Sequence, residues 1–253
     1  MYNKAIHQLL NSKAAYYNQR SFIPPDPISI PHQYTLLQDV EIAALFAALF
    51  AWGNRTTIIN KTTELLQLMD NAPYQFVTQH QSKHLKHFLG FKHRTFTQED
   101  VLYFIYFLQH HYTKHTSLET AFFTPAITTV EAALNHFKTY FFSLPHLART
   151  HKHIASPAQY SACKRLCMYL RWLVRTDASG VDFGLWKSIA PSQLIIPLDV
   201  HVGNIARQLG LLPTNSTNNW QAAVGLTNTL KLYNAQDPVL YDFALFSMGV
   251  LES

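Results

Sequence analysis

The run VEIAALFAALF, from Val40 to Phe50, constrains the fold more than any other part of the chain. Apart from Glu41 it is apolar, and it is dominated by Ala, Leu and Phe rather than by alternating β-branched residues. A helix that is apolar almost all round has to be enclosed by other elements. We therefore expect a buried helix with Asp39 as its N-cap, at the centre of an all-α protein.

Helical patterns recur along the rest of the chain. We expect further helices over roughly 56–69, 73–80, 98–111, 117–123, 129–142, 159–176, 200–209 and 237–248, with Pro157 opening the helix over 159–176. The four prolines in SFIPPDPISIPH forbid a regular helix there, so residues 1–38 are expected to form an extended strap. Residues 180–197 are expected to form a loop with one short helix around 185–189.

Several classes of protein are disfavoured by composition. No stretch of about 18 apolar residues exists, and the first residues lack the apolar core of a secretory signal, so a cytoplasmic location without a membrane partner is expected. Two cysteines, Cys163 and Cys167, are too few for a four-cysteine iron–sulfur or zinc site. The histidine clusters HHYTKH and HKH lack accompanying carboxylates, and we therefore expect no metal and no cofactor.

The positive charge of the chain is concentrated in one segment. The formal net charge is +5, and the segment from Arg149 to Lys187 alone holds seven basic and two acidic residues. Those basic residues are Arg149, Lys152, Lys164, Arg165, Arg171, Arg175 and Lys187. Such a patch is typical of a protein that binds a polyanion, although a solvated basic helix face without a partner has the same composition.

The helix in this segment predicts an exposed basic stripe. At about 100° per residue, Lys164, Arg171 and Arg175 fall on one side and the leucines on the other. A stripe of this kind suits contacts with phosphates. Lys164 has a second possible role, because an unprotonated lysine amine can attack a carbon atom. Its role as a nucleophile, a phosphate contact or a plain surface lysine stays open at this point.

A second candidate group is Asp199, in the stretch LIIPLDVHVGNIARQLGLL. Apolar residues precede it and a helical pattern follows it as far as Gly210, which is in the position of a helix-ending glycine. Aspartate is a favoured N-cap, and the helix dipole stabilises its charge. Two interpretations of Asp199 therefore stay open: it only caps the helix, or it caps the helix and also acts in an active site.

Two motifs resemble the helix-hairpin-helix superfamily of DNA glycosylases. The stretch IIPLDVHVGNIARQLGL is similar to the pattern that surrounds the superfamily's aspartate, and SPAQYSACKRLCMYLRWLVR is similar to its hairpin and the helix that opens with a lysine. Matching positions in the first motif are Asp199, His201, Val202, Ile205, Arg207, Leu209 and Gly210. The stretches DPISIPH, WGNR, SACKRL, LRWLVR and PLDVH resemble, more closely, an uncharacterised bacterial family within this superfamily.

The resemblance implies a fold of two interleaved helical lobes with DNA crossing a central cleft. It implies one structural unit over 1–253, with residues 39–145 mainly in the first lobe, 146–212 forming the hairpin and aspartate region, and 213–253 forming C-terminal helices. The implied activity is base-excision repair on a flipped-out oxidised or damaged base such as 8-oxoguanine, with AP lyase activity through a lysine Schiff base. The catalytic roles then fall on Asp199 and Lys164.

The resemblance and the charge pattern together give the remaining candidate residues. Expected contacts with double-stranded DNA are Arg165, Arg171, Arg175, Lys152, Asn54 and Arg55. Expected residues of the substrate pocket are His201, Trp52, Trp172 and Cys167. No iron–sulfur cluster is expected, and a monomer is the default expectation for the oligomeric state.

The chain also departs from the superfamily pattern. Its hairpin reads SPAQYSA and lacks the usual glycines, so that backbone amides approach a phosphate less easily. The segment between Lys164 and Asp199 is longer than in endonuclease III and resembles that of the archaeal 8-oxoguanine glycosylases. A non-catalytic DNA- or RNA-binding module and an enzyme acting on a small molecule therefore stay open beside the glycosylase.

Overall fold

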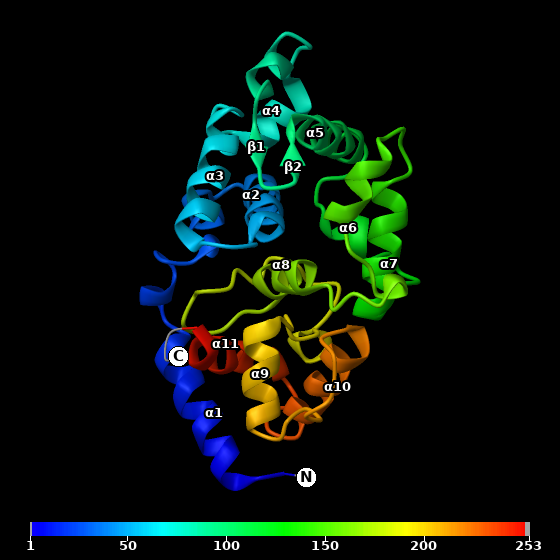
Figure 1. The fold of residues 1–253 in the computed structure, drawn as a ribbon. Helices are drawn as coiled ribbons and strands as arrows, with labels where there is room; N and C mark the ends of the chain where they lie inside the picture. Colours follow the sequence, from blue (N-terminus) through cyan, green and yellow to red (C-terminus); the bar gives the residue numbers. More distant parts are fainter. Residues whose placement is uncertain (1, 251–253) are drawn as a thin grey trace. The chain divides into compact units, whose positions relative to one another are not determined.

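The computed structural model describes residues 2–250, and these residues are helical apart from loops and one short hairpin (Figure 1). The helices are α1 (Lys4–Tyr17), α2 (Leu37–Phe50), α3 (Arg55–Gln67), α4 (Pro73–Gln79), α5 (Gln98–Tyr112), α6 (Glu119–Phe122), α7 (Val130–Phe141), α8 (Lys164–Val174), α9 (Val200–Gln208), α10 (Trp220–Lys231) and α11 (Asp242–Val250). Strands β1 (Lys92–His93) and β2 (Phe96–Thr97) pair antiparallel, with Lys92 opposite Thr97. The expected all-α class is confirmed.

The chain divides into two compact units. Unit 1 contains the chain up to Ile23, residues 129–135 and the chain from Ala155 onward, whereas unit 2 contains residues 24–128 and 136–154. Unit 2 thus holds the residues expected in the first lobe, except for 129–135. Met1 and residues 251–253, which belong to the expected strap and C-terminal region, lie outside the described residues.

Helix α2 is enclosed within unit 2, as its sequence predicts. Every residue from Val40 to Phe50 is buried, and the ring of Phe46 packs against Phe104 of α5. The buried Glu41 carboxylate accepts hydrogen bonds from the Tyr112 hydroxyl at 2.8 Å and from the Leu118 amide at 3.0 Å. These donors satisfy the one charged group that the apolar run carries into the core.

The expected N-cap of α2 is wrong. The helix begins at Leu37, so that Asp39 lies in its first turn, and its N-cap residue Leu36 makes no side-chain cap. The Asp39 carboxylate instead accepts from the Tyr74 amide of α4 at 2.8 Å. Asp39 therefore joins two helices, a contact that a local capping pattern does not reveal.

The expected extended strap is also wrong for the first part of the chain. Residues 4–17 form α1, whose N-cap Asn3 accepts from the Ala5 amide at 2.9 Å. The prolines that exclude a helix begin only at Pro24, and the segment around them forms short 3-10 turns at Pro27–Ser29 and Pro31–Gln33. Residues 1–23 contain no proline, so proline does not exclude a helix there.

Unit 1 is built around α11, which packs against α1 and α9 (Figure 1). Gly249 allows the close approach of α9, since a Cβ there would lie 3.1 Å from the Cβ of His201. Helix α8 begins at Lys164 rather than near Pro157, which opens a separate 3-10 turn over Pro157–Gln159. The short helix expected at 185–189 does not form, and a 3-10 turn occurs at Pro191–Gln193 instead.

None of the helices in residues 2–250 is both long and apolar enough to cross a membrane.

Candidate functional site

The two residues that the motifs single out come together in unit 1. Lys164 is the first residue of α8, and Asp199 is the N-cap residue of α9. The Lys164 Nζ atom lies 3.6 Å from the Asp199 Oδ2 atom, and the two side chains keep 25% and 21% of their surface exposed. A lysine amine and a carboxylate therefore face each other at a site that solvent reaches.

The two oxygens of Asp199 have different partners. Oδ1 accepts a hydrogen bond from the Val202 amide at 2.9 Å, which is a standard N-cap bond. Oδ2 faces the amine of Lys164. The predicted cap is confirmed, and the cap leaves the second oxygen available to a reacting group.

Side-chain hydrogen bonds of Asn218 and Arg207, which we call the Asn218 brace, fix the backbone at Asp199. The sequence did not reveal them. The Asn218 side-chain amide donates to the Asp199 carbonyl at 2.8 Å, and Arg207 donates to the Asn218 Oδ1 atom and, at 3.1 Å, to the Ser216 carbonyl. Gly203 makes room for the brace, since a Cβ there would lie 2.5 Å from Asn218 Oδ1. The only signal in the sequence was a glycine inside a helical pattern, which often marks a close approach.

The turn before α8 is formed without glycine. Tyr160 and Cys163 adopt left-handed conformations, with φ of 57° and 51°. The Cys163 amide donates to the Ser161 hydroxyl at 3.1 Å, and the Ala158 amide donates to the Asn135 side chain at 3.0 Å. Side chains, and not glycines, therefore hold this turn.

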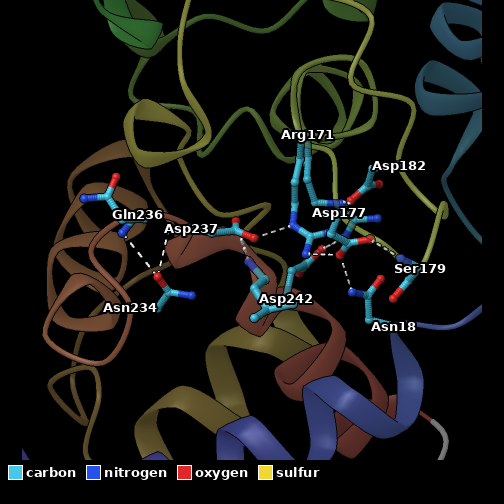
Figure 2. Close-up of polar contacts among 11 residues, drawn as sticks. Asn18, Arg171, Asp177, Ser179, Asp182, Asn234, Gln236, Asp237 and Asp242 are labelled. Atoms are coloured by element: carbon cyan, nitrogen blue, oxygen red, sulfur yellow. Dashed lines mark hydrogen bonds and ion pairs between the residues drawn. The ribbon is translucent and has the colours of Figure 1, made fainter.

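The prediction that Arg171 and Arg175 lie on an exposed stripe is wrong. Only 4% and 1% of their surfaces are exposed, and both pair with carboxylates. Figure 2 shows Arg171 among these acidic side chains. Arg171 pairs with Asp242 and, at 3.3 Å, with Asp182. Arg175 pairs with Asp177 at 2.5 Å, Asp182 at 2.9 Å and Asp237 at 2.8 Å. Asp177 and Asp182 follow α8 closely in the sequence, whereas Asp237 and Asp242 lie 62 and 71 residues from the arginines they pair with. A projection of α8 alone includes none of these carboxylates, so it cannot show that the basic face is covered.

Asp242 extends this buried cluster towards the candidate site. Burial raises the pKa of its carboxyl to about 6, the Arg171 guanidinium opposes that rise, and the charges of Asp199 and Lys164 also act on it. Asp242 is the first residue of α11, and it connects the arginine cluster electrostatically with the Lys164–Asp199 pair. The sequence did not single it out, because the helix expected over 237–248 places Asp242 inside the helix, whereas α11 begins at this residue.

The remaining candidates divide between the two units. In unit 1, Arg165 is half-buried, and the exposed His201 donates through Nδ1 to the Gly249 carbonyl at 3.0 Å. Trp172 and Cys167 are buried, so the expectation that they present a surface to a substrate is wrong. Both are among the residues of α8 that packing encloses.

In unit 2, Lys152 and Asn54 are exposed, Arg55 is half-buried and 52% of the Trp52 surface is exposed. The Asn54 side chain caps α3 by accepting from the Thr57 amide at 3.2 Å. In residues 2–250 no group of three or more His, Cys, Asp or Glu side chains could hold a metal ion.

Comparison with known families assigns the chain to one of them. The family described as a protein of unknown function, DUF2400, matches residues 26–251. The chain belongs to this family. The DUF2400 match includes Lys164, Asp199, Asn218 and Asp242 and begins after α1. Neither the curated proteins nor the solved structures contain a significant match.

Proposed function

We propose that the chain is a DNA base-excision repair glycosylase with AP lyase activity, in which Lys164 is the nucleophile and Asp199 its partner. The observation that carries the proposal is the 3.6 Å approach of Lys164 Nζ to Asp199 Oδ2. The helix-hairpin-helix resemblance supplies the reaction class, and the paired amine and carboxylate are the groups this chemistry requires. The substrate is a damaged base, such as 8-oxoguanine, flipped out of double-stranded DNA.

The proposed reaction begins with the unprotonated amine of Lys164. Its nitrogen attacks the sugar C1′ atom, the N-glycosidic bond breaks, and the electron pair leaves with the base. Asp199 Oδ2 accepts the proton that the amine releases and passes it to the departing base. Asp199 also stabilises the positive charge that develops on the sugar, because its cap bond to Val202 keeps the carboxylate in place.

Opening of the sugar ring then gives a protonated Schiff base between Lys164 and C1′. The Asp199 carboxylate, unprotonated again, then takes a proton from C2′, the C3′–O bond breaks, and the 3′ phosphate leaves with the electron pair, which cuts the strand. Water finally hydrolyses the Schiff base and releases the lysine. Each step needs only the amine, the carboxylate and water. This mechanism requires no metal and no redox cofactor.

Borohydride trapping tests the proposal. Borohydride reduces the Schiff base to a stable amine, so the wild-type chain should become covalently linked to duplexes that carry an abasic site or 8-oxoguanine. Lys164→Ala should lose the linkage, whereas Lys231→Ala, which changes a lysine in the last turn of α10, should keep it. The absence of both a trapped complex and base release from the wild-type chain would contradict the proposal.

A second candidate function is a nucleic-acid-binding module that retains the fold without turnover. The observation that favours it is the turn SPAQYSA before α8, where Tyr160 is 71% exposed and no glycine opens the backbone to a phosphate. This module would bind nucleic acid in a salt-sensitive manner and would form no adduct. The same trapping experiment therefore separates the two functions.

A further inference from the structure

Trp52 is the tryptophan that unit 2 exposes. Its surface is 52% exposed, whereas Trp172, Trp186 and Trp220 are at most 3% exposed. An exposed indole is a large apolar surface that proteins normally bury or use for contact with a partner. The position of Trp52 therefore requires an explanation beyond core packing.

A guanidinium group stacks on this indole. The Arg94 Cζ atom lies 4.6 Å from the centroid of the Trp52 ring. Arg94 is in the turn between β1 and β2 and adopts a left-handed conformation with φ of 53°. Gly53 has φ of 109°, and a Cβ at this position would lie 2.1 Å from Arg94 Nη2. The glycine thus leaves room for the arginine beside the tryptophan.

Neighbouring contacts anchor both partners of this stack. The buried His93 donates through Nε2 to the Phe50 carbonyl at 3.1 Å, and its ring lies 4.8 Å from the Phe50 ring. The Trp52 amide also donates to the Phe50 carbonyl, at 2.6 Å. The hairpin and the end of α2 are therefore joined at one carbonyl, and the Trp52–Arg94 stack is held on a fixed backbone.

The chain around Arg94 is strongly basic. Residues 71–98 contain no Asp or Glu, and their cations Lys83, Lys86, Lys92 and Arg94 are all exposed. Within the part of the chain that the structure describes, none of these four makes an ion pair with a carboxylate. A flat stack of an aromatic ring and a guanidinium group, in a stretch of chain rich in cations, is complementary to a nucleobase and its adjoining phosphates.

We propose that the Trp52–Arg94 stack is a binding site for an unpaired nucleobase, and that Lys92 and its basic neighbours hold the adjoining phosphates. Nucleobases stack on tryptophan regardless of sequence because every base has a π-face. This site goes beyond the proposed chemistry at Lys164, and it binds single-stranded nucleic acid whether or not that chemistry occurs. Its predicted ligand is therefore a strand with accessible bases.

Two oligomers of equal charge test the proposal. One is a ten-residue thymidine strand, and the other is a ten-residue strand of abasic sugar phosphates, which has the backbone without the bases. The wild-type chain should bind the thymidine strand roughly ten-fold more tightly. The thymidine strand should also quench the tryptophan fluorescence and protect it from iodide, since Trp52 is the exposed indole of the described residues.

Variants test whether the Trp52–Arg94 stack causes the preference for the thymidine strand over the abasic strand. Trp52→Ala and Trp52→Leu should each bind the two oligomers with nearly equal affinity, and Gly53→Ala should lose much of the preference because its Cβ displaces Arg94. Tyr106→Ala is the matched control, since Tyr106 is 47% exposed on α5 of the same unit, and it should keep the preference. Circular dichroism of each variant verifies the fold.

The proposal is overturned if the wild-type chain binds both oligomers equally or if the Trp52 variants keep the preference. Failure of this site and failure of the proposed function give different results. A chain that stacks bases but forms no borohydride adduct contradicts the glycosylase, and a chain that forms the adduct without a base preference contradicts the stacking site.

Discussion

At the scale of single residues, Asp199 shows how one side chain can cap a helix and face a reacting group. Oδ1 is bound to the Val202 amide and Oδ2 faces the amine of Lys164. The sequence left capping and chemistry as alternatives, because an aspartate at the start of a helix needs no role other than that of an N-cap. The geometry makes them compatible, and variants that keep or remove the cap can separate them.

Asp199→Asn should keep the N-cap hydrogen bond of α9 but remove the negative charge of the carboxylate. Asparagine caps helices about as well as aspartate, so the free energy of unfolding should change little, whereas Asp199→Ala should lower it by about 1 kcal/mol. Both variants remove the carboxylate, and the rate of adduct formation should fall at least roughly a hundred-fold in each. Chemical denaturation and timed borohydride trapping measure the two effects. Wild-type trapping rates in Asp199→Asn would exclude the proposed role of the carboxylate.

His111 should make the stability of the chain depend on pH. Its ring is buried, Nε2 donates to the Ser117 carbonyl at 2.9 Å, and Nδ1 lies 3.2 Å from the Tyr140 hydroxyl. Burial lowers the pKa of His111 to about 4, so the folded ring stays neutral at pH values where the unfolded ring is protonated. The stabilisation is present above pH 6.5 and is lost as the pH falls towards 4, by about 3 kcal/mol.

The measurement for His111 is the melting temperature between pH 4 and pH 7. His111→Gln keeps a donor for the Ser117 carbonyl but cannot take up a proton, so its melting temperature should fall less steeply with acid. His87→Gln, which changes an exposed histidine, should follow the wild-type curve. Parallel curves for the wild type and His111→Gln would refute this assignment.

At the scale of secondary-structure elements, α8 shows what a helical projection can and cannot predict. Its leucines are buried as expected, but Arg171 and Arg175 are buried too. Burial by itself lowers the pKa of Arg175, and the carboxylates of Asp182, Asp237 and Asp177 more than reverse that effect. The periodicity of one helix identifies its apolar face, whereas the acidic side chains that cover its other face lie outside the helix, partly in the loop that follows it and partly at Asp237 and Asp242.

Arg175→Met should therefore act on stability. Removing the cation leaves Asp177 and Asp237 without an arginine partner and leaves Asp182 with Arg171 alone, which should lower the free energy of unfolding by about 3–5 kcal/mol. Lys4→Met changes an exposed lysine at the start of α1 and should alter stability by less than about 0.5 kcal/mol. Urea denaturation measures both. A loss below about 1 kcal/mol for Arg175→Met would contradict the structural role.

Local patterns predicted many of the elements and fewer of their contacts. The buried α2, the Asp199 cap and the end of α9 before Gly210 followed from residues that are adjacent in sequence. The Asp39–Tyr74 bond, the Asn218 brace and the cluster around Arg171 join residues far apart in the chain. That Lys164 and Asp199 belong to one site was predicted only from the family resemblance, because their spacing in the sequence does not show that the starts of two helices lie close together.

At the scale of the whole molecule, the distribution of available charge differs from the distribution along the sequence. The segment from Arg149 to Lys187 has the larger formal excess, but carboxylates neutralise its two buried arginines. The exposed cations between Lys83 and Arg94 have no acidic residue among them. We therefore expect unit 2 to contribute strongly to binding of a polyanion.

The salt dependence of DNA binding tests that expectation. In the triple variant Lys83→Gln, Lys86→Gln, Lys92→Gln, the slope of log K against log salt concentration should decrease in magnitude by about 2–3, if each lysine neutralises one phosphate. Lys114→Gln removes an exposed lysine of the same unit that lies outside residues 71–98 and should leave the slope unchanged. Equal slopes for the wild type and the triple variant would place the phosphate contacts elsewhere.

The most direct measurement of the central claim is the position of the trapped covalent bond. The chain is reduced with borohydride on a duplex that contains one abasic site, digested with nuclease and protease, and analysed by peptide mass spectrometry. We expect the reduced sugar to be attached to the Lys164 side chain, within the stretch SACKRLCMYLR at the start of α8. Attachment to any other amine, or a complete lack of adduct, would contradict it.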